Sequence, residues 1–145
     1  MEKININLVY ISKMDIEYEK FTVANQQVKK QDAQKSPCVR INKVSNNYFT
    51  IIMFDPDAPN GMGHENHGYI HWWVSNIKYK KGECVSAREF IPYAGPDPPS
   101  GTHRYIFYLY EHEKPLSPVS VSRKNFSFNL VKNLTLIEKK GFVVK

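Results

Sequence analysis

The chain has 145 residues, of which 41% are hydrophobic, a length that suits one domain spanning residues 1–145 with a sizeable buried core. Its 20 basic residues exceed its 14 acidic ones, but they occur as scattered pairs, which disfavours direct nucleic-acid binding. Two cysteines, Cys38 and Cys84, are too few for a disulfide framework or a zinc ribbon, so we expect both as reduced thiols. No apolar run approaches the roughly 20 residues of a transmembrane span, and the N-terminus lacks the apolar core of a signal peptide. We therefore expect a cytoplasmic protein with no transmembrane segment.

The first half of the chain predicts short strands separated by polar turns. Isoleucine and leucine alternate with asparagine over residues 4–8, which predicts an opening strand with one buried face. The polar residues 17–36 predict a surface crossing with at most an edge strand at 21–23. Residues 39–44 and 48–54 read as a hairpin about an Asn-Asn turn, and the second arm is nearly all apolar, which is typical of a central strand.

The second half predicts two longer strands and a little helix. Residues 69–77 alternate so that His71 should share a face with Tyr69 and Trp73 and oppose the face of Trp72. Residues 103–110 predict a strand that places His103 and Tyr105 on one face. Asn125 is expected to cap a short helix that carries Phe126, Leu130 and Leu134. Gly141 is expected to end any helix before it, and residues 142–144 are expected to form a last edge strand.

Two loop-rich stretches concentrate chemically active side chains. Residues 55–76 read DPDAPNGMGHENHGYIHWWVSN and follow the apolar run directly, and residues 93–110 read YAGPDPPSGTHRYIFYLY. Four of the five histidines lie in these stretches: His64, His67, His71 and His103. Loops that hold Asp, His and Tyr on a rigid scaffold commonly carry function, so the two stretches together predict a site.

These stretches resemble the two signature regions of the phosphatidylethanolamine-binding protein family, which includes Raf kinase inhibitor protein and plant flowering regulators. The resemblance rests on DPDAP, YIHWWVSNI and YAGPDPPSGTHRYIFYLYEH, is sharp over residues 55–112, and is weaker over RKNFSFNLVKNLTL at 123–136. It implies a mostly β fold, an antiparallel β-sandwich with one or two short helices and a small pocket at one edge. It also implies a non-enzymatic binding protein without a cofactor, which takes a phosphate-containing small molecule or phospholipid headgroup and acts as a regulatory or adaptor module toward signalling proteins such as kinases.

The resemblance also implies which residues bind the ligand. Carried over position by position they are Asp55, Asp57, Pro59, Tyr69, His71, Gly95, Pro96, Pro98, Pro99, His103 and Tyr105. Imidazoles, a tyrosine hydroxyl and loop N–H groups are suitable donors to a phosphoester. We expect Asp57 to hold His71 in its protonated form, a second carboxylate to receive an ethanolamine ammonium, and Ala58–Pro59 to be cis as in the related proteins.

The chain departs from the family pattern in two places. Gly68 stands directly before Tyr69, where the family commonly has an acidic residue. Longer members carry a C-terminal helix that closes over the pocket, and this chain ends at Lys145, so we expect a more open pocket and weak affinity, on the order of 0.1 to 1 mM.

Other interpretations of the same residues stay open. His71 and His103 could be hydrogen-bonded core histidines, and Asp55 and Asp57 could be turn-formers. The Asp/His cluster, with His64 and His67, contains enough ligands for a metal-dependent hydrolase, although the neighbouring glycines disfavour the helix that such spacing needs. A protein-interaction module that ignores small ligands is a further alternative.

Overall fold

The computed structural model describes residues 11–58 and 68–145, and the strand expected at residues 4–8 lies outside this part of the chain. Two sheets form the fold, one six-stranded in the order β2-β8-β7-β4-β5-β6 and one two-stranded, β1-β3. The elements are β1 (Met14–Glu17), β2 (Gln27–Val28), the 3-10 helix η1 (Lys30–Ala33), β3 (Cys38–Ile41), β4 (Tyr48–Asp55), β5 (Tyr69–Lys78), β6 (Glu89–Ile91), β7 (His103–His112), the 3-10 helix η2 (Phe128–Val131) and β8 (Thr135–Val144). In the described residues no helix has the length and apolar character needed to cross a membrane.

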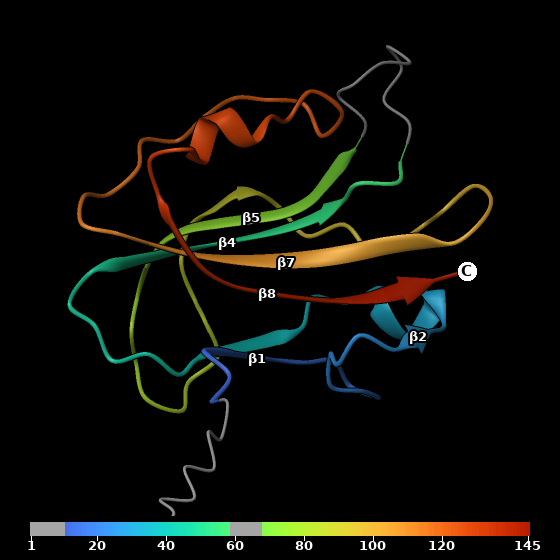
Figure 1. Ribbon diagram of the computed structural model, residues 1–145, viewed down its shortest axis with the longest axis horizontal. Coiled ribbons are helices and arrows are strands. Elements are labelled where there is room, and N and C mark those ends of the chain that lie inside the picture. Colours follow the sequence, from blue (N-terminus) through green and yellow to red (C-terminus); the bar gives the residue numbers. More distant parts are fainter. Residues whose placement is uncertain (1–10, 59–67) are drawn as a thin grey trace, which may run out of the picture.

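The six-stranded sheet is covered on both faces (Figure 1). One face packs against β1 and β3 through residues such as Ile16, Val39 and Phe107. The other face packs beneath the segment that contains η2, through residues such as Trp73 and Phe126. Because β4 pairs with β5 and β7 and lies between these two layers, its residues from 49 to 55 are all buried. The predicted mostly β sandwich and the central position of the apolar strand are therefore confirmed.

The predicted hairpin between residues 39–44 and 48–54 is wrong. β3 pairs with β1 in the smaller sheet, with Ile41 opposite Met14, and the chain then crosses to the larger sheet before β4 begins. Val44 lies in this crossing and is 78% exposed. Adjacent apolar runs can pair with each other or face each other across a core, and local pattern does not distinguish the two arrangements.

The predicted facing of β5 is wrong beyond His71 because the strand contains a bulge. Met53 pairs with Trp72, but the next residue, Phe54, pairs with Ile70, so His71 is an extra residue on β5. A bulge changes the alternation of side chains. Trp72 therefore packs in the core between the two sheets, and Trp73 packs on the opposite face with Ile70.

The C-terminal third also differs from its prediction. No α-helix starts at Asn125: Ser127 caps the four-residue η2, its side chain accepting from the Asn129 N–H. Gly141 ends no helix, because it lies within β8, which is ten residues long and pairs with β7. A Cβ at Gly141 would lie 2.7 Å from the Tyr105 carbonyl oxygen, so the close approach of the two strands requires glycine. The expected edge strand at 21–23 is reduced to an isolated bridge between Glu17 and Thr22.

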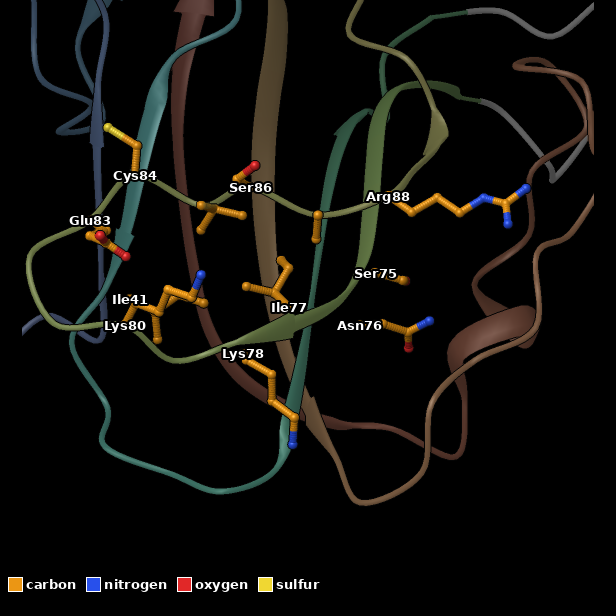
Figure 2. A pocket seen from close by; sticks show the side chains of 12 residues that line it. Ile41, Ser75, Asn76, Ile77, Lys78, Lys80, Glu83, Cys84, Ser86 and Arg88 are labelled. Atoms are coloured by element: carbon orange, nitrogen blue, oxygen red, sulfur yellow. The ribbon is translucent and has the colours of Figure 1, made fainter.

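The expectation of two reduced thiols is also corrected. Cys38 on β3 and Cys84, in the segment after β5, form a disulfide with a Cα–Cα distance of 5.1 Å. The two residues are separated by 46 positions, and only the folded chain brings β3 beside that segment. Figure 2 shows the chain running from Cys84 through Ser86 to Arg88, with Ile77 and Lys78 at the end of β5 on the other side of a hollow.

Candidate functional site

A cavity of about 380 Å³ lies where β4 ends and where β5 and β7 begin. The antiparallel pairing creates this meeting point, since Asp55 is the last residue of β4, Tyr69 lies opposite it, and Phe54 lies opposite Ile106 of β7. The cavity is lined by Asp55, Ala58, Tyr69, His71, Ala94, Gly95, Asp97, Pro98, Pro99, His103, Tyr105 and Lys124. Most of the predicted site residues are thus brought together in one place, and Ala58, Ala94, Asp97 and Lys124 were not predicted.

Asp55 is the buried acceptor at the base of the cavity. Its Oδ1 accepts from the backbone N–H groups of Asp57 and Ala58 at 2.8 and 3.1 Å, which forms the tight turn after β4. Its Oδ2 accepts from Nδ1 of His103 at 2.7 Å. Burial is the main reason why the pKa of the neighbouring Tyr105 is raised, and the Asp55 charge is a further cause, so the hydroxyl keeps its proton. Asp55 is therefore both a turn-former and the partner of a histidine.

Both ring nitrogens of His103 face acceptors. Nδ1 faces the Asp55 carboxylate, and Nε2 lies 3.0 Å from the Ser100 carbonyl oxygen. A ring nitrogen that carries a proton can donate to the acceptor that it faces. His103 is buried and its nitrogens are engaged by the protein, so it stabilises the cavity wall.

His71 presents its imidazole to the cavity by a different arrangement. Its Nδ1 donates to the Ala94 carbonyl oxygen at 2.7 Å, and the Ala94 N–H donates back to the His71 carbonyl at 2.8 Å. Nε2 is therefore the nitrogen that this ring can offer to a ligand. Burial lowers the pKa of His71 below its ordinary value and outweighs the opposing effects of the Ala94 hydrogen bond and the Asp55 charge, so the ring is neutral near pH 7.

The expected pairing of Asp57 with His71 is wrong. Asp57 accepts from the backbone N–H, Nε and Nη2 of Arg104 at 2.8, 3.0 and 2.9 Å, and it does not line the cavity. Hydrogen bonds from the Arg104 side chain are the largest cause of the lowered pKa of Asp57. Asp57 follows Asp55 by two residues, but the turn after β4 directs the two carboxylates to different bases. Asp55 takes His103 and Asp57 takes the exposed Arg104.

Pro96 is a further predicted residue that does not line the described cavity. The carbonyl oxygen of Pro96 accepts from Nε2 of Gln34 at 2.8 Å, which fastens the cavity wall to the segment after η1. Pro59, and with it the predicted cis bond after Ala58, lies outside the described residues. Gly95 is packed so closely against Gln34 that a Cβ would lie 2.7 Å from the Gln34 side-chain oxygen.

Arg123 positions the cavity rim and was not predicted as a site residue. Its guanidinium donates to the carbonyl oxygens of Ile70, His71 and Pro92 at 3.3, 3.0 and 2.7 Å. These bonds join β5 to the chain that leads into the cavity wall. They also fix the position of the next residue, Lys124, whose side chain lines the cavity and makes no ion pair within the described part of the chain. The weaker motif RKNF contained the signal for both residues.

The backbone conformation and the packing at Gly68 explain why this chain has glycine where the family commonly has an acidic residue. Its φ is +133°, and a Cβ there would lie 2.0 Å from the Phe54 ring. Backbone conformation and packing therefore both require glycine. The N–H of Gly68 donates to the Ala58 carbonyl at 2.8 Å, which joins the chain on either side of residues 59–67.

The structure offers little to a metal ion. Residues 11–58 and 68–145 contain no group of three or more His, Cys, Asp or Glu placed to hold one. Asp55 and His103 are already engaged with each other and with the protein, while His64 and His67 of the predicted cluster lie outside the described residues. The hydrolase alternative gains no geometric support.

Comparison with known proteins identifies the sequence relatives. The model of the family "Phosphatidylethanolamine-binding protein" matches residues 11–140. Protein MOTHER of FT and TFL1 homolog 2 of Oryza sativa subsp. japonica is 39% identical over 86 residues, which are 59% of this chain and 49% of that protein. Protein SELF-PRUNING of Solanum lycopersicum is 37% identical over 82 residues, 55% of this chain and 46% of that protein. The chain thus spans about half the length of these curated relatives in the matched region.

Solved structures agree in fold. A carboxypeptidase Y inhibitor, crystallised in complex with its cognate proteinase, has a TM-score of 0.75 and 25% identity, with 91% of this chain and 82% of that chain covered. A phosphatidylethanolamine-binding protein from Plasmodium vivax has a TM-score of 0.67 at 18% identity, covering 91% and 84% of the two chains, and this likeness concerns the fold alone.

Proposed function

Because this chain belongs to the phosphatidylethanolamine-binding protein family, we propose that it is a binding protein whose cavity beside His71 takes small phosphoesters, free or as phospholipid headgroups. The observation that carries the proposal is that the protein itself engages both oxygens of Asp55. Oδ1 accepts from two backbone N–H groups, and Oδ2 lies 2.7 Å from Nδ1 of His103. Among the described residues, the cavity offers a ligand the ammonium of Lys124, which suits an anion, and Nε2 of His71, which becomes a donor to an anion once the imidazole is protonated.

The cavity also contains an acid suited to a zwitterionic ligand. Asp97 lines the rim, its side chain is 80% exposed, and it pairs with Lys30 at 2.8 Å. In our proposal the phosphate lies near His71 and Lys124, and an ethanolamine ammonium competes with Lys30 for Asp97. Asp97 therefore takes the role that the sequence suggested for a second carboxylate. Because Lys124 and Asp97 are exposed, solvent screens their charges, and we expect a dissociation constant on the order of 0.1 to 1 mM.

Affinity should depend on pH through His71. Burial keeps the pKa of this ring low in the unliganded protein, whereas a bound phosphate favours the imidazolium. Affinity should therefore increase as the pH falls from neutrality through and below the ordinary histidine range near 6.5. The direction is the one expected from the sequence, but the cause is a buried, neutral imidazole and not an imidazolium held by Asp57.

Titration with phosphoethanolamine, followed by NMR of the histidine ring protons, tests the proposal. His71→Ala should weaken binding by at least about tenfold, since a charge-assisted hydrogen bond contributes about 1.5 to 3 kcal/mol. Asp57→Ala is the matched control, because this carboxylate pairs with Arg104 outside the cavity and its loss should leave affinity unchanged. An absence of shifts at His71 up to tens of millimolar ligand, roughly ten or more times the expected dissociation constant, would refute the proposal.

Two rim variants separate the parts of the ligand. Lys124→Ala should weaken inorganic phosphate and phosphoethanolamine alike, by up to about fivefold for an exposed charge pair. Asp97→Asn should weaken phosphoethanolamine relative to phosphate. If both ligands respond equally to Asp97→Asn, the ammonium does not contact this acid.

We extend the proposal to a regulatory or adaptor role toward a protein partner, such as a kinase, and it includes no chemical step at the cavity. It is supported by the family membership and by the structural similarity to a carboxypeptidase Y inhibitor that was solved in complex with its proteinase. Phosphoethanolamine should reduce the affinity for a partner that docks over the cavity. A purified kinase domain whose binding is absent, or is unaffected by saturating ligand, would contradict this extension.

A further inference from the structure

The Cys38–Cys84 disulfide fastens one exposed segment to the smaller sheet. This segment, residues 79–88 between β5 and β6, is called the strap below. It leaves the six-stranded sheet, reaches β3, and returns to the six-stranded sheet at β6. Figure 2 shows the strap crossing beside a hollow of about 760 Å³, whose opposite wall is the end of β5. Cys84 is exposed, whereas Cys38 is half-buried.

The other contacts that hold the strap against β3 are few. The Val85 N–H donates to the Val39 carbonyl at 2.7 Å, and Nε of Arg40 donates to the Gly82 carbonyl at 3.2 Å. Three of its apolar side chains, those of Tyr79, Val85 and Ala87, are only partly buried against the core. On the side that faces the hollow, the strap does not pack against other residues that the structure describes. Segments with few buried contacts are those that open locally at the lowest free energy.

The strap is separated from the ligand cavity by a firmly paired region. The Ser75 N–H donates to the Arg88 carbonyl at 3.2 Å, and Ile91 of β6 pairs with Trp73. Only after β6 does the chain reach Ala94, which is bonded in both directions to His71. Release of the strap should therefore stop at β6 and leave the His71 contacts in place.

We propose that Cys84 is a thiol–disulfide exchange site and that its reduction releases the strap from β3. A thiolate of a dithiol reductant attacks Sγ of the exposed Cys84, the bond to Cys38 breaks, and Cys38 leaves as a thiolate that takes up a proton. The second thiol of the reductant then resolves the mixed disulfide and leaves Cys84 as a thiol. Two electrons pass to the protein, and the reductant becomes a disulfide. Lys80 and Lys81, just before Cys84, place positive charge in this region, which favours the approach of a thiolate.

Reduction exposes surface that the strap covers. β3 pairs with β1 on one side, and the strap meets its other edge through the Val39 carbonyl and Arg40. With the strap released, this edge and the apolar floor of the hollow, Ile41 and Ile77, face solvent.

Amide hydrogen exchange tests the proposal on the oxidised protein, on the same protein reduced with dithiothreitol, and on Cys84→Ser. Reduction should raise the exchange rate of the Val85 amide by about tenfold or more relative to any change at the Ala94 amide. Cys84→Ser should match the reduced protein and respond no further to dithiothreitol. A Val85 amide that stays protected after reduction would overturn the proposal, as would equal acceleration at Val85 and Ala94, which indicates global destabilisation. Failure of excess dithiothreitol to generate reactive thiols would equally reject Cys84 as an exchange site.

Discussion

Replacing Asp55 by alanine should lower the free energy of unfolding, because this buried carboxylate accepts hydrogen bonds from groups inside the protein. The carboxylate is 2% exposed, and the donors that it leaves behind are the buried His103 ring and two backbone N–H groups on partly exposed residues. Each buried donor without an acceptor costs about 1 to 3 kcal/mol, and the two backbone groups can reach water. We therefore expect Asp55→Ala to lower the free energy of unfolding by about 1 to 3 kcal/mol, mainly because the buried His103 nitrogen loses its acceptor.

Equilibrium unfolding in urea measures this change, because Trp72 and Trp73 are both buried and their fluorescence reports the loss of packing. Asp97→Ala is the matched control, since this acid lines the same cavity but is fully exposed, and its loss should leave the midpoint unchanged. Asp55→Asn should cost less than the alanine variant, because the amide oxygen can still accept the two backbone N–H groups. An Asp55→Ala midpoint within experimental error of the wild type would refute the assignment of Asp55 as the buried acceptor.

Three further changes should be measurable. Because Arg104 lowers the pKa of Asp57 below its ordinary 3.8, the pair stabilises the protein above that pH, and this stabilisation is lost as the pH falls through the lowered pKa. Asp57→Asn should flatten that part of the acid unfolding curve, and an unaltered curve would contradict the pairing. The double variant Cys38→Ser, Cys84→Ser should lower the free energy of unfolding in urea by up to about 4 kcal/mol, because the disulfide closes a loop of 46 positions. Equal free energies of unfolding for this variant and the wild-type protein would contradict the disulfide. Gly68→Ala should lower the melting temperature, because its φ of +133° and a ring 2.0 Å from the new Cβ both oppose a side chain; an unchanged melting temperature would contradict this backbone conformation.

The local sequence determined much of the fold and the membership of the site. An apolar run that ends at DPDAP predicts a buried strand leading into a polar turn, and β4 has this form, with Asp55 as its last residue. His71, His103 and Tyr105 were placed in the site by two motifs, and all three line one cavity. These conclusions depend on burial and on residue type, which the sequence reports directly through the spacing of apolar side chains.

Only the tertiary structure decided which groups meet. The sequence offered two carboxylates and several bases, and the turn after β4 assigned His103 to Asp55 and Arg104 to Asp57. Likewise, one extra residue in β5 places His71 in a bulge, and no periodic pattern in the sequence indicates a bulge.

The disulfide shows the same limit over a longer distance. β3 and the strap come together because the chain crosses between two sheets, first after β3 and again after β5. Hydrophobic periodicity shows which face of a strand is buried, but its partner and register depend on the packing of the whole chain. For that reason the composition of the site could be predicted from this sequence, whereas its hydrogen-bond partners and the Cys38–Cys84 bond could not.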